Sequence, residues 1–431
     1  MSTTVTKDIF ERRESEARSY CRNFDTIFTK AVGSEMTDAD GKTYIDFLAG
    51  CSSLNYGHND PDMKQALVEH IMGDGIAHGL DMYTAEKARF LETFESHILQ
   101  PRGMDDYKIM MTGPTGTNAV EAAMKLARKV TGRRNIITFT NGFHGMTMGA
   151  LSLTGNASKR AGAGNSCGGL CGVTHMPYDG AFGEGVDTLS QIEMMLENTS
   201  SGIDAPAAFI FEPIQGEGGL NAASIEWMQG IAKLAEKHGA MLIIDDIQSG
   251  CGRSGTYFSI EEAGIKPDMI TQAKSLSGFG LPFAALLIKK QYDIWKPAEH
   301  NGTFRGNTHA FVTGRVTLEK FWADDSFQTK VQEKAVQLTA GLQVIADEIP
   351  GAKLKGRGMM QGVDVGSGEM ASDICARAFE KGLIIETSGA DDEVVKVLVA
   401  LTVPTETLQK GLDILLEAVR EASATNKIAA E

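Results

Sequence analysis

The stretch MLIIDDIQSGCGRSGTYFSIEEAGIKPDMITQAK, residues 241–274, decides the fold. Its two short apolar runs, 241–244 and 269–273, are bounded by polar residues and glycines, which is typical of strands buried on both faces of a parallel sheet. Asp245 follows the first run and Lys274 follows the second. Because ligands bind at the carboxyl ends of the strands in open α/β sheets, we expect Asp245 and Lys274 to meet at one edge of one sheet.

Other predicted strands end in residues with useful chemistry. The run 135–140 leads into Phe143, and the run 207–211 leads directly into Glu212. Gln248 lies three residues beyond the acid that ends the 241–244 strand. If these strands are parallel, one edge of the sheet collects an aromatic ring, an amide and several charged groups.

The connections between these strands define the kind of sheet. A helix predicted over residues 224–238 joins the strands 207–211 and 241–244, and a strand–helix–strand unit of this kind requires the two strands to be parallel. The loop after Lys274 is too short to hold a crossover helix, so residues 283–288 should return antiparallel. We therefore predict an α/β fold whose mixed, mostly parallel sheet is flanked by helices.

The length of 431 residues predicts more than one domain. From about residue 325 the pattern changes to long helices around a small set of strands, and a turn at residues 38–41 predicts a hairpin near the start. We expect residues 66–324 to form the large domain. Residues 1–65 and 325–431 should together form a smaller α+β domain.

A glycine- and threonine-rich segment precedes one predicted helix. In TGPTGTNAVEAAMKLARKVTG, residues 112–132, the apolar helical face begins near Asn118, so Gly116 and Thr117 should lie in the loop before it. Free backbone N–H groups, threonine hydroxyls and the helix dipole together make a phosphate site. On this motif alone, a simple turn with a helix cap remains an equal alternative.

Charge and cysteine content exclude several classes of protein. Lys and Arg number 41 against 56 Asp and Glu, and the net charge of −15 argues against nucleic acid or an anionic membrane as a partner. Six cysteines lack a framework spacing, and Cys167 and Cys171 have no second ligand pair nearby, so no metal site is predicted. No apolar run approaches the length of a membrane span and no signal peptide is present, which favours the cytoplasm.

A phosphate site, an aromatic residue, an acid and a lysine at one sheet edge suit pyridoxal phosphate. The amine of Lys274 would form a Schiff base with the cofactor's aldehyde, and Asp245 would keep the ring nitrogen protonated. Gln248 would reach the ring hydroxyl and Phe143 would stack on the ring. Each residue alone has a purely structural alternative, such as a turn former, a solvated lysine or a core aromatic. Their convergence on one edge favours the cofactor site.

Five phrases, DDIQSGCGRSG, TQAKSLSG, NGFHG, FEPIQGEGG and HNGTFRGN, resemble in order and spacing the class III pyridoxal-phosphate-dependent aminotransferases. The resemblance implies the roles just described and places the cofactor's phosphate at Gly116 and Thr117. It also implies that Thr303 reaches this phosphate from the neighbouring subunit, which would make a homodimer, or a higher oligomer built from it, necessary for activity.

Longer phrases, including YIDFLAG, SLNYGHN, WKPAEHNGTFRGN and GLIIETSG, resemble those class III enzymes that transfer the amino group of L-glutamate to L-aspartate 4-semialdehyde, the first step of ectoine synthesis in osmotic stress. This resemblance implies basic residues for the substrate carboxylates, with Arg22 and Lys396 as candidates. It also implies a catalytic role for Glu212 in a Glu212–Lys396 pair, closed for an ω-amine substrate and open for glutamate. Arg253, in the turn beside Asp245, is expected to be structural.

Several alternatives remain open at this point. Within class III, the substrate could be that of an ornithine- or 4-aminobutyrate-type ω-aminotransferase, and a decarboxylase or racemase could use the same cofactor. A nicotinamide-dependent dehydrogenase is disfavoured because no G-x-G-x-x-G lies between a predicted strand and helix with an acid about twenty residues beyond. A non-catalytic protein of the same fold is the last alternative.

Overall fold

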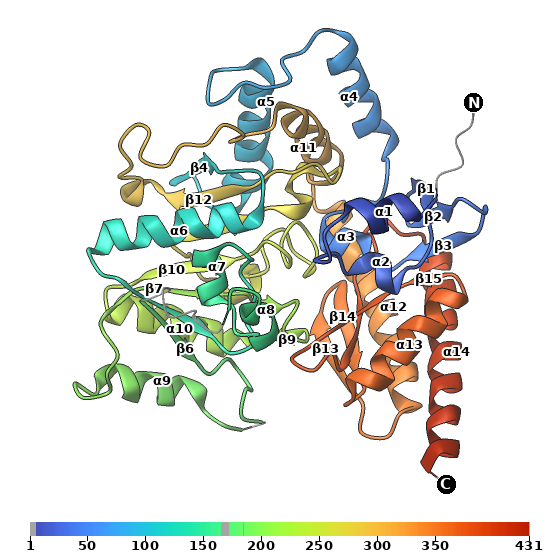
Figure 1. Ribbon diagram of the computed structural model, residues 1–431. Helices are drawn as coiled ribbons and strands as arrows, with labels where there is room; N and C mark the ends of the chain where they lie inside the picture. The colour runs from blue at the N-terminus through green and yellow to red at the C-terminus, as the bar shows by residue number, and fades with distance from the viewer. Residues whose placement is uncertain (1–5, 165–171, 184, 431) are drawn as a thin grey trace.

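The computed structural model describes residues 6–164, 172–183 and 185–430 (Figure 1). Its largest sheet has seven strands in the order β4-β12-β11-β10-β7-β5-β6. The strands of this sheet are β4 (Tyr107–Met111), β5 (Asn135–Phe139), β6 (Val173–Met176), β7 (Pro206–Phe211), β10 (Met241–Asp245), β11 (Met269–Gln272) and β12 (Ala285–Lys289).

The sheet is mixed, as predicted. Strand β10 runs parallel to both β11 and β7, and β5 runs parallel to β7 and β6. Strand β12 is antiparallel to β11 and to β4. The strands β5, β7, β10 and β11 therefore end at one common edge, and this arrangement brings together the residues that follow them.

Both faces of the sheet are buried, which explains the continuous apolar runs in its strands. Side chains of β7 alternate between the faces: Ala208 and Ile210 pack with Val120 of helix α6, whereas Phe209 and Phe211 join the cluster around Trp227 of helix α10. The rings of Phe211 and Trp227 meet edge to face at 5.3 Å. Helices on both faces fix the sheet in the interior. These helices are α6 (Gly116–Thr131) and α10 (Ile225–Lys237).

Three further helices form a layer over the β4–β12 side of the large sheet (Figure 1). The ring of Phe90 in α5 lies 5.5 Å from that of Phe311 in α11, so aromatic packing joins two segments far apart in the sequence. The first of these helices begins at Pro61, whose fixed φ suits the first position of a helix. The three helices are α4 (Pro61–Met72), α5 (Ala85–Phe94) and α11 (Thr308–Phe321).

Two smaller sheets come from the two ends of the chain. The first contains β1 (Phe28–Val32), β2 (Glu35–Asp38), β3 (Thr43–Asp46) and β15 (Leu383–Ile384). The second contains β13 (Lys353–Arg357), β14 (Met360–Asp364), β17 (Val394–Val397) and β16 (Glu386–Ser388). Because β15 pairs in parallel with β3, the N- and C-terminal segments share one sheet.

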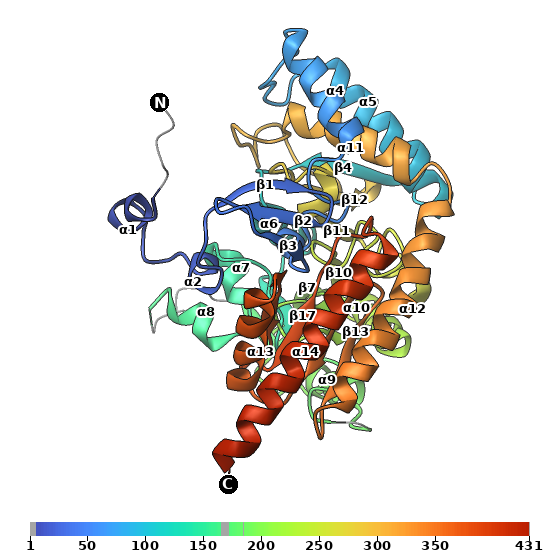
Figure 2. The same ribbon diagram turned by 90° about the vertical axis from the view of Figure 1, so that its right-hand side faces the viewer.

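Long helices accompany these sheets, and Figure 2 shows them side by side. They are α12 (Ser326–Asp347), α13 (Gly368–Glu380) and α14 (Thr405–Ala430). The predicted fold class, a large mixed-sheet domain with a smaller α+β domain from both chain ends, is confirmed. The boundaries at residues 65 and 324 stay a prediction.

The remaining elements are short. The helices are α1 (Asp8–Arg13), α2 (Tyr20–Asn23), α3 (Ala49–Ser52), α7 (Met148–Leu153), α8 (Ala157–Ala161) and α9 (Thr188–Glu197), and the strands are β8 (Ile214–Gln215) and β9 (Asn221–Ala222). Single π or 3₁₀ turns occupy Glu95–Leu99, Gln100–Arg102, Glu261–Ala263, Lys274–Ser277 and Lys290–Tyr292.

The buried side chains of Leu151 and Leu153 anchor α7 in the core, and α8 follows it. The structure corrects one local expectation. Helix α6 begins at Gly116 rather than Asn118, since Thr115 and Asn118 form a capping box. Cys167 and Cys171 lie outside the described residues.

No helix in the described part of the chain is long and apolar enough to cross a membrane. Within the same part of the chain, no group of three or more histidine, cysteine or acidic side chains could hold a metal ion.

Candidate active site

A cavity of about 150 Å³ lies at the common edge of β5, β7, β10 and β11. It is lined by Gly116, Thr117, Phe143, His144, Gly145, Glu212, Asp245, Ile247, Gln248 and Lys274. The structure thus brings together every predicted site residue of the large domain except Thr303. The prediction that these strand ends meet is confirmed by their shared position around one space.

Lys274 follows β11 directly and opens a 3₁₀ turn. Its backbone φ of 49° lies in the left-handed region, which costs free energy for a residue other than glycine and is maintained only by the surrounding structure. Burial lowers the pKa of the Lys274 amine. A larger fraction of neutral amine makes this lysine a better nucleophile than a solvated one.

Asp245 is held rigidly by hydrogen bonds to both oxygens. Its Oδ2 lies 2.6 Å from Nδ1 of His144, and its Oδ1 accepts from Oγ1 of Thr271 at 3.0 Å and from the backbone N–H of Ile247 at 3.3 Å. Burial alone would lower the pKa of His144, but the hydrogen bond and charge of Asp245 outweigh it and raise that pKa. Asp245 thus favours the protonated form of His144.

Glu212 fixes the backbone that carries the aromatic residue. Its Oε2 accepts from the N–H of Phe143 at 2.8 Å, and its Oε1 accepts from the N–H of Gly216 at 3.4 Å. Burial raises the pKa of Glu212, against the opposing effect of the nearby His144. These contacts show how Phe143 is positioned at the wall of the cavity.

The glycine–threonine segment forms the first turn of α6, where backbone N–H groups have no partner inside the helix. Oγ1 of Thr117 lies 2.6 Å from Oγ1 of Thr147, which donates to Oε1 of Glu121 at 2.7 Å. A Cβ at Gly116 would lie 2.8 Å from Cδ1 of Ile247, so a larger residue would have to displace that side chain. The arrangement leaves room and donors for a phosphate.

Lys396, on β17, is fully buried between two carboxylates. Its Nζ lies 2.9 Å from Oε1 of Glu217 and 2.9 Å from Oε1 of Glu386. Burial alone would lower the pKa of Lys396, but the two acids raise it far above its ordinary value. The prediction that Lys396 pairs with Glu212 is wrong. Lys396 pairs instead with Glu217, five residues beyond Glu212.

Glu217 links Lys396 to Gln248, one of the residues that line the cavity. Burial alone would raise its pKa, yet Lys396 and Lys274 lower it. Nε2 of Gln248 donates to Oε1 of Glu217 at 3.4 Å and to the carbonyl oxygen of Cys51 at 3.2 Å. The sequence motif FEPIQGEGG contains Glu217 but does not indicate a role for it. Glu386 could not be predicted from the sequence, because it faces Lys396 only through the pairing of β16 with β17.

Two predicted site residues lie away from this cavity. Arg22, in α2, pairs with Glu16 at 2.6 Å and is 55% exposed. Thr303 is exposed in the loop before α11. Neither side chain lines the cavity of its own chain, so their assigned roles stay predictions.

Arg253 is completely buried and binds neutral groups from several segments. Its guanidinium donates to Asn55 at 2.7 Å and to the carbonyl oxygens of Met359 and Val399 at 3.0 and 2.6 Å. Burial lowers the pKa of Arg253 to about 9. It joins the turn after β10 to both ends of the chain, which is a structural role.

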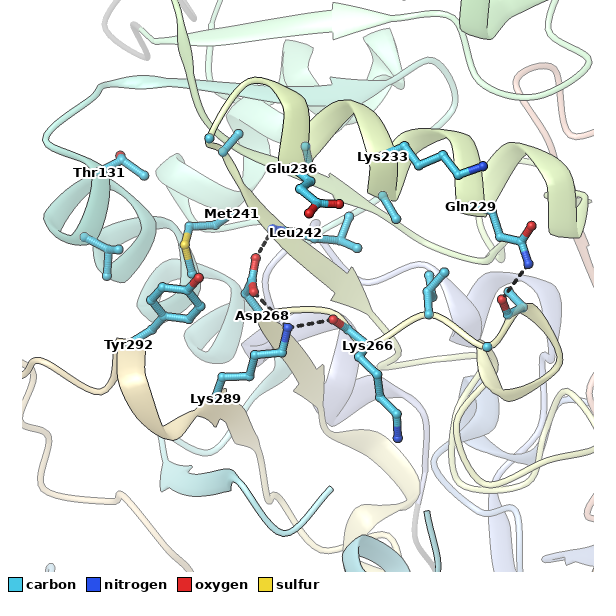
Figure 3. A pocket seen from close by; sticks show the side chains of 18 residues that line it. Thr131, Gln229, Lys233, Glu236, Met241, Leu242, Lys266, Asp268, Lys289 and Tyr292 are labelled. Carbon is cyan, nitrogen blue, oxygen red and sulfur yellow. Dashed lines mark hydrogen bonds and ion pairs between the residues drawn. The ribbon is translucent and has the colours of Figure 1, made fainter. Parts of the chain in front are cut away.

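A larger surface hollow, of about 780 Å³, lies around the start of β10 and the end of α10 (Figure 3). Its polar groups bind one another: Nζ of Lys289 contacts Asp268 at 3.1 Å and donates to the carbonyl oxygen of Lys266 at 2.8 Å. Lys274 and Asp245 do not line it. We therefore take the smaller cavity, with its perturbed lysine and buried acids, as the candidate active site.

Residues 17–419 match the model of the class-III aminotransferase family. The chain therefore belongs to this family, whose members are transaminases that use pyridoxal phosphate and act on small amino and keto acids. Family membership excludes the dehydrogenase and the non-catalytic protein considered above.

Curated relatives are similar over nearly the whole chain. The protein is 52% identical to the diaminobutyrate–2-oxoglutarate transaminase of Halalkalibacterium halodurans over 423 residues, which cover 98% of each chain. It is 53% identical to that of Vibrio cholerae, over 95% of this chain and 98% of the relative. It is 52% identical to the enzyme of the same name from Halomonas elongata, over 96% of this chain and 99% of the relative.

Solved structures of transaminases share the fold. A transaminase from the marine bacterium Virgibacillus superposes with a TM-score of 0.85 at 19% identity, covering 97% of this chain and 99% of that one. The ornithine aminotransferase of Toxoplasma gondii gives a TM-score of 0.81 at 23% identity, covering 97% and 95%.

The residues around the cavity fit pyridoxal phosphate. The first turn of α6 offers N–H donors and the Thr117 hydroxyl for the phosphate, and Phe143 offers an aromatic face. Asp245 offers a carboxylate fixed by His144, and Lys274 offers an amine of lowered pKa. A phosphate, a ring, a basic ring nitrogen and an aldehyde each find a complementary group here.

Proposed function

We propose that the protein transfers the amino group of L-glutamate to L-aspartate 4-semialdehyde, which gives 2-oxoglutarate and L-2,4-diaminobutyrate, the first step of ectoine synthesis. The observation that carries this proposal is that relatives 51–53% identical over nearly the full chain are diaminobutyrate–2-oxoglutarate transaminases. The buried Lys396, linked to the cavity through Glu217 and Gln248, supports it, because glutamate carries a carboxylate on its reacting carbon.

Bound pyridoxal phosphate supplies an aldehyde that takes up the amino group and a ring that withdraws electrons from the reacting carbon. Nζ of Lys274 holds the cofactor between turnovers and moves the proton of the substrate carbon. Asp245, fixed by His144, keeps the ring nitrogen protonated through a charge-assisted hydrogen bond. Gln248 reaches the ring hydroxyl.

Two further contacts orient the ring and the phosphate. Glu212 holds the backbone of Phe143 and so keeps the aromatic ring against the cofactor. The N–H groups of Gly116 and Thr117 bind the phosphate at the positive end of the α6 dipole. Glu212 thereby acts on the reaction by positioning Phe143.

The ion pair between Lys396 and Glu217 separates the two kinds of substrate. A substrate that reacts through its terminal amine has no carboxylate on the reacting carbon, so the pair stays closed. Glutamate carries a carboxylate on that carbon, and this group replaces Glu217 on Lys396. Arg22 is the second candidate for a substrate carboxylate, after a rearrangement that releases it from Glu16.

The proposed assembly is a cytoplasmic homodimer, or a higher oligomer built from it, in which Thr303 reaches the partner's cofactor phosphate. Support comes from large exposed apolar side chains at the end of α4 and in the loops before α5 and α11: Met72, Tyr83 and Phe304 are 79%, 102% and 65% exposed. Exposed apolar groups of this kind mark interaction surfaces. Mixing Lys274→Ala chains with Thr303→Ala chains tests sharing, because a mixed dimer would contain one site with both residues intact.

The function is tested with the purified holoenzyme in two separate half-reactions. Glutamate alone should convert the bound cofactor and release one 2-oxoglutarate per site. Aspartate 4-semialdehyde should then restore the starting spectrum and appear as diaminobutyrate. If succinic semialdehyde or the ornithine-derived semialdehyde restores the spectrum more efficiently, the protein is an ω-aminotransferase of another substrate type.

A further inference from the structure

A second carboxylate contacts Lys396 and has no part in the exchange described for Glu217. Glu386 lies on β16 directly opposite Lys396 on β17 in the antiparallel register. Its residue is 8% exposed, and its Oε1 lies 2.9 Å from Nζ of Lys396. The same ammonium also pairs with Glu217, so one buried positive charge serves two carboxylates. Two buried carboxylates that share one counter-charge are costly, and a ligand that brings a second positive charge would relieve the cost.

Charge balance points to the kind of donor. Lys396 carries one positive charge between the two carboxylates of Glu217 and Glu386, so the three groups together carry one excess negative charge. When a substrate carboxylate replaces Glu217 on Lys396, the excess is the same. The cluster therefore favours a ligand with an additional positive charge in either state.

Glu386 belongs to the substrate side of the cavity. Its charge raises the pKa of the Lys274 amine against the larger effect of burial, and it also helps to raise the pKa of the Cys51 thiol and of the Tyr20 hydroxyl. The hydroxyl of Tyr20 lies 2.8 Å from Sγ of Cys51, and Tyr20 is 47% exposed. Glu386 is joined to the cavity through its ion pair with Lys396, which contacts Glu217, the partner of Gln248.

The four reactants of the proposed reaction differ in one respect. Aspartate 4-semialdehyde and diaminobutyrate each carry an α-ammonium group that takes no part in the chemistry. The only amino group of glutamate is the one that reacts, and 2-oxoglutarate has none. A residue that recognises a second ammonium group would therefore act on one half-reaction and leave the other unaffected.

We propose that Glu386 binds the non-reacting α-ammonium group of diaminobutyrate and of aspartate 4-semialdehyde, and so selects these substrates over ω-amines that lack it. This inference rests on the proposed function. The ammonium group would bring a second positive charge to the two carboxylates and bind Glu386 in a charge-assisted hydrogen bond. The pairing of β16 with β17 holds Glu386 in a fixed position opposite Lys396.

Two amines that differ only in the α-amino group provide the test: L-2,4-diaminobutyrate and 4-aminobutyrate. The cofactor conversion of the holoenzyme is followed by its visible spectrum at rising concentrations of each amine and of L-glutamate. Glu386→Gln keeps the size of the side chain and removes its charge. We expect it to weaken half-saturation by diaminobutyrate about tenfold or more, as for a lost hydrogen bond to a charged group, with little change for 4-aminobutyrate or glutamate.

Controls separate recognition from structural support. Glu380→Gln, an exposed residue at the end of α13, should retain wild-type values for all three amines. Glu386→Asp keeps the charge but shortens its reach, so it should weaken diaminobutyrate alone and serves if the glutamine variant does not fold. Thermal unfolding and the spectrum of the resting enzyme report whether each variant is intact.

Equal weakening of all three amines by Glu386→Gln would mean that Glu386 only orders Lys396, and it would overturn the proposal. Unchanged selection of diaminobutyrate over 4-aminobutyrate would overturn it as well. A wild-type enzyme that does not react with diaminobutyrate would instead remove the proposed function on which this inference rests, so the two failures are distinguishable.

Discussion

The edge of the seven-stranded sheet and the small C-terminal sheet both contribute charged side chains to the active site, and they differ in what fixes those side chains. At the large sheet, Asp245 and Lys274 directly follow parallel strands, so the direction of the chain alone brings them together. In the small sheet, Lys396 is positioned by strand register and by Glu217 from a loop of the large domain. In the proposed mechanism the first region would hold the cofactor and the second would recognise substrate.

This difference between the two regions indicates which charged side chain can exchange its partner. The partners of Asp245, His144 and Thr271, lie at the same edge of the large sheet, and neither is assigned a contact with substrate. The partner of Lys396 comes from another part of the fold and must be exchangeable if two unlike substrates share one site. Changes at the sheet edge should therefore affect both half-reactions, whereas changes around Lys396 should affect them unequally.

The largest effect is expected for Lys274→Ala. Loss of the amine removes covalent attachment of the cofactor as well as the group that moves the proton, so turnover should fall by several powers of ten in both half-reactions. The visible absorption of the lysine-bound cofactor should disappear at the same time. Turnover at a normal rate in this variant would contradict the assignment.

The next largest effect is expected for Asp245→Asn. The cofactor should remain bound through its phosphate, while the reaction slows about 10³-fold, as for other lost electrostatic stabilisers. Single-turnover rates with glutamate and with diaminobutyrate should fall together, because the ring is common to both. A loss confined to one amine would show that Asp245 acts on substrate rather than on the cofactor.

Lys396→Met should reduce the free energy of unfolding by about 3 kcal/mol or more, since it leaves Glu217 and Glu386 buried without a counter-charge. Denaturant unfolding measures the loss. Adding Glu217→Gln to this variant should recover part of it, whereas adding Glu212→Gln should not, because Glu212 does not contact Lys396. If Glu212→Gln recovers the lost free energy of unfolding instead, Lys396 pairs with Glu212, as first expected from the sequence.

The smallest effect is expected for His144→Gln, through pH. The pKa of His144 is raised in the folded protein, so its contribution to stability is fully present below the unfolded pKa of about 6.5 and is lost as pH rises through the higher folded value. The wild type should lose stability over this neutral-to-alkaline window, and the variant should lack that part of the change. Parallel curves of melting temperature against pH would contradict the pairing of His144 with Asp245.

The fold and the cofactor side were predictable because each depends on local signals. Apolar runs ending in Asp245 or Lys274, and one strand–helix–strand unit, were sufficient to bring the key residues to one edge. The start of α6 was displaced by two residues because the capping box of Thr115 with Asn118 was not recognised. Helix α7 could not be predicted, because the glycines around it are typical of a loop.

The substrate side was less accessible to sequence reasoning. Glu212 and Glu217 occur in one phrase, and only the course of the loop after β7 decides that the first turns to the backbone of Phe143 and the second to Lys396. Glu386 meets Lys396 through the register of a short strand pair, which no periodicity in the sequence reports. Contacts between segments that are far apart in the sequence can be identified only in the folded structure.

The most direct test of the central claim is to trap the cofactor reductively on the wild-type holoenzyme and to identify the modified peptide by mass spectrometry. The account predicts one cofactor per chain, attached to Lys274, and complete loss of the label after brief treatment with glutamate before reduction. A label on another lysine, or one that glutamate does not remove, would contradict it.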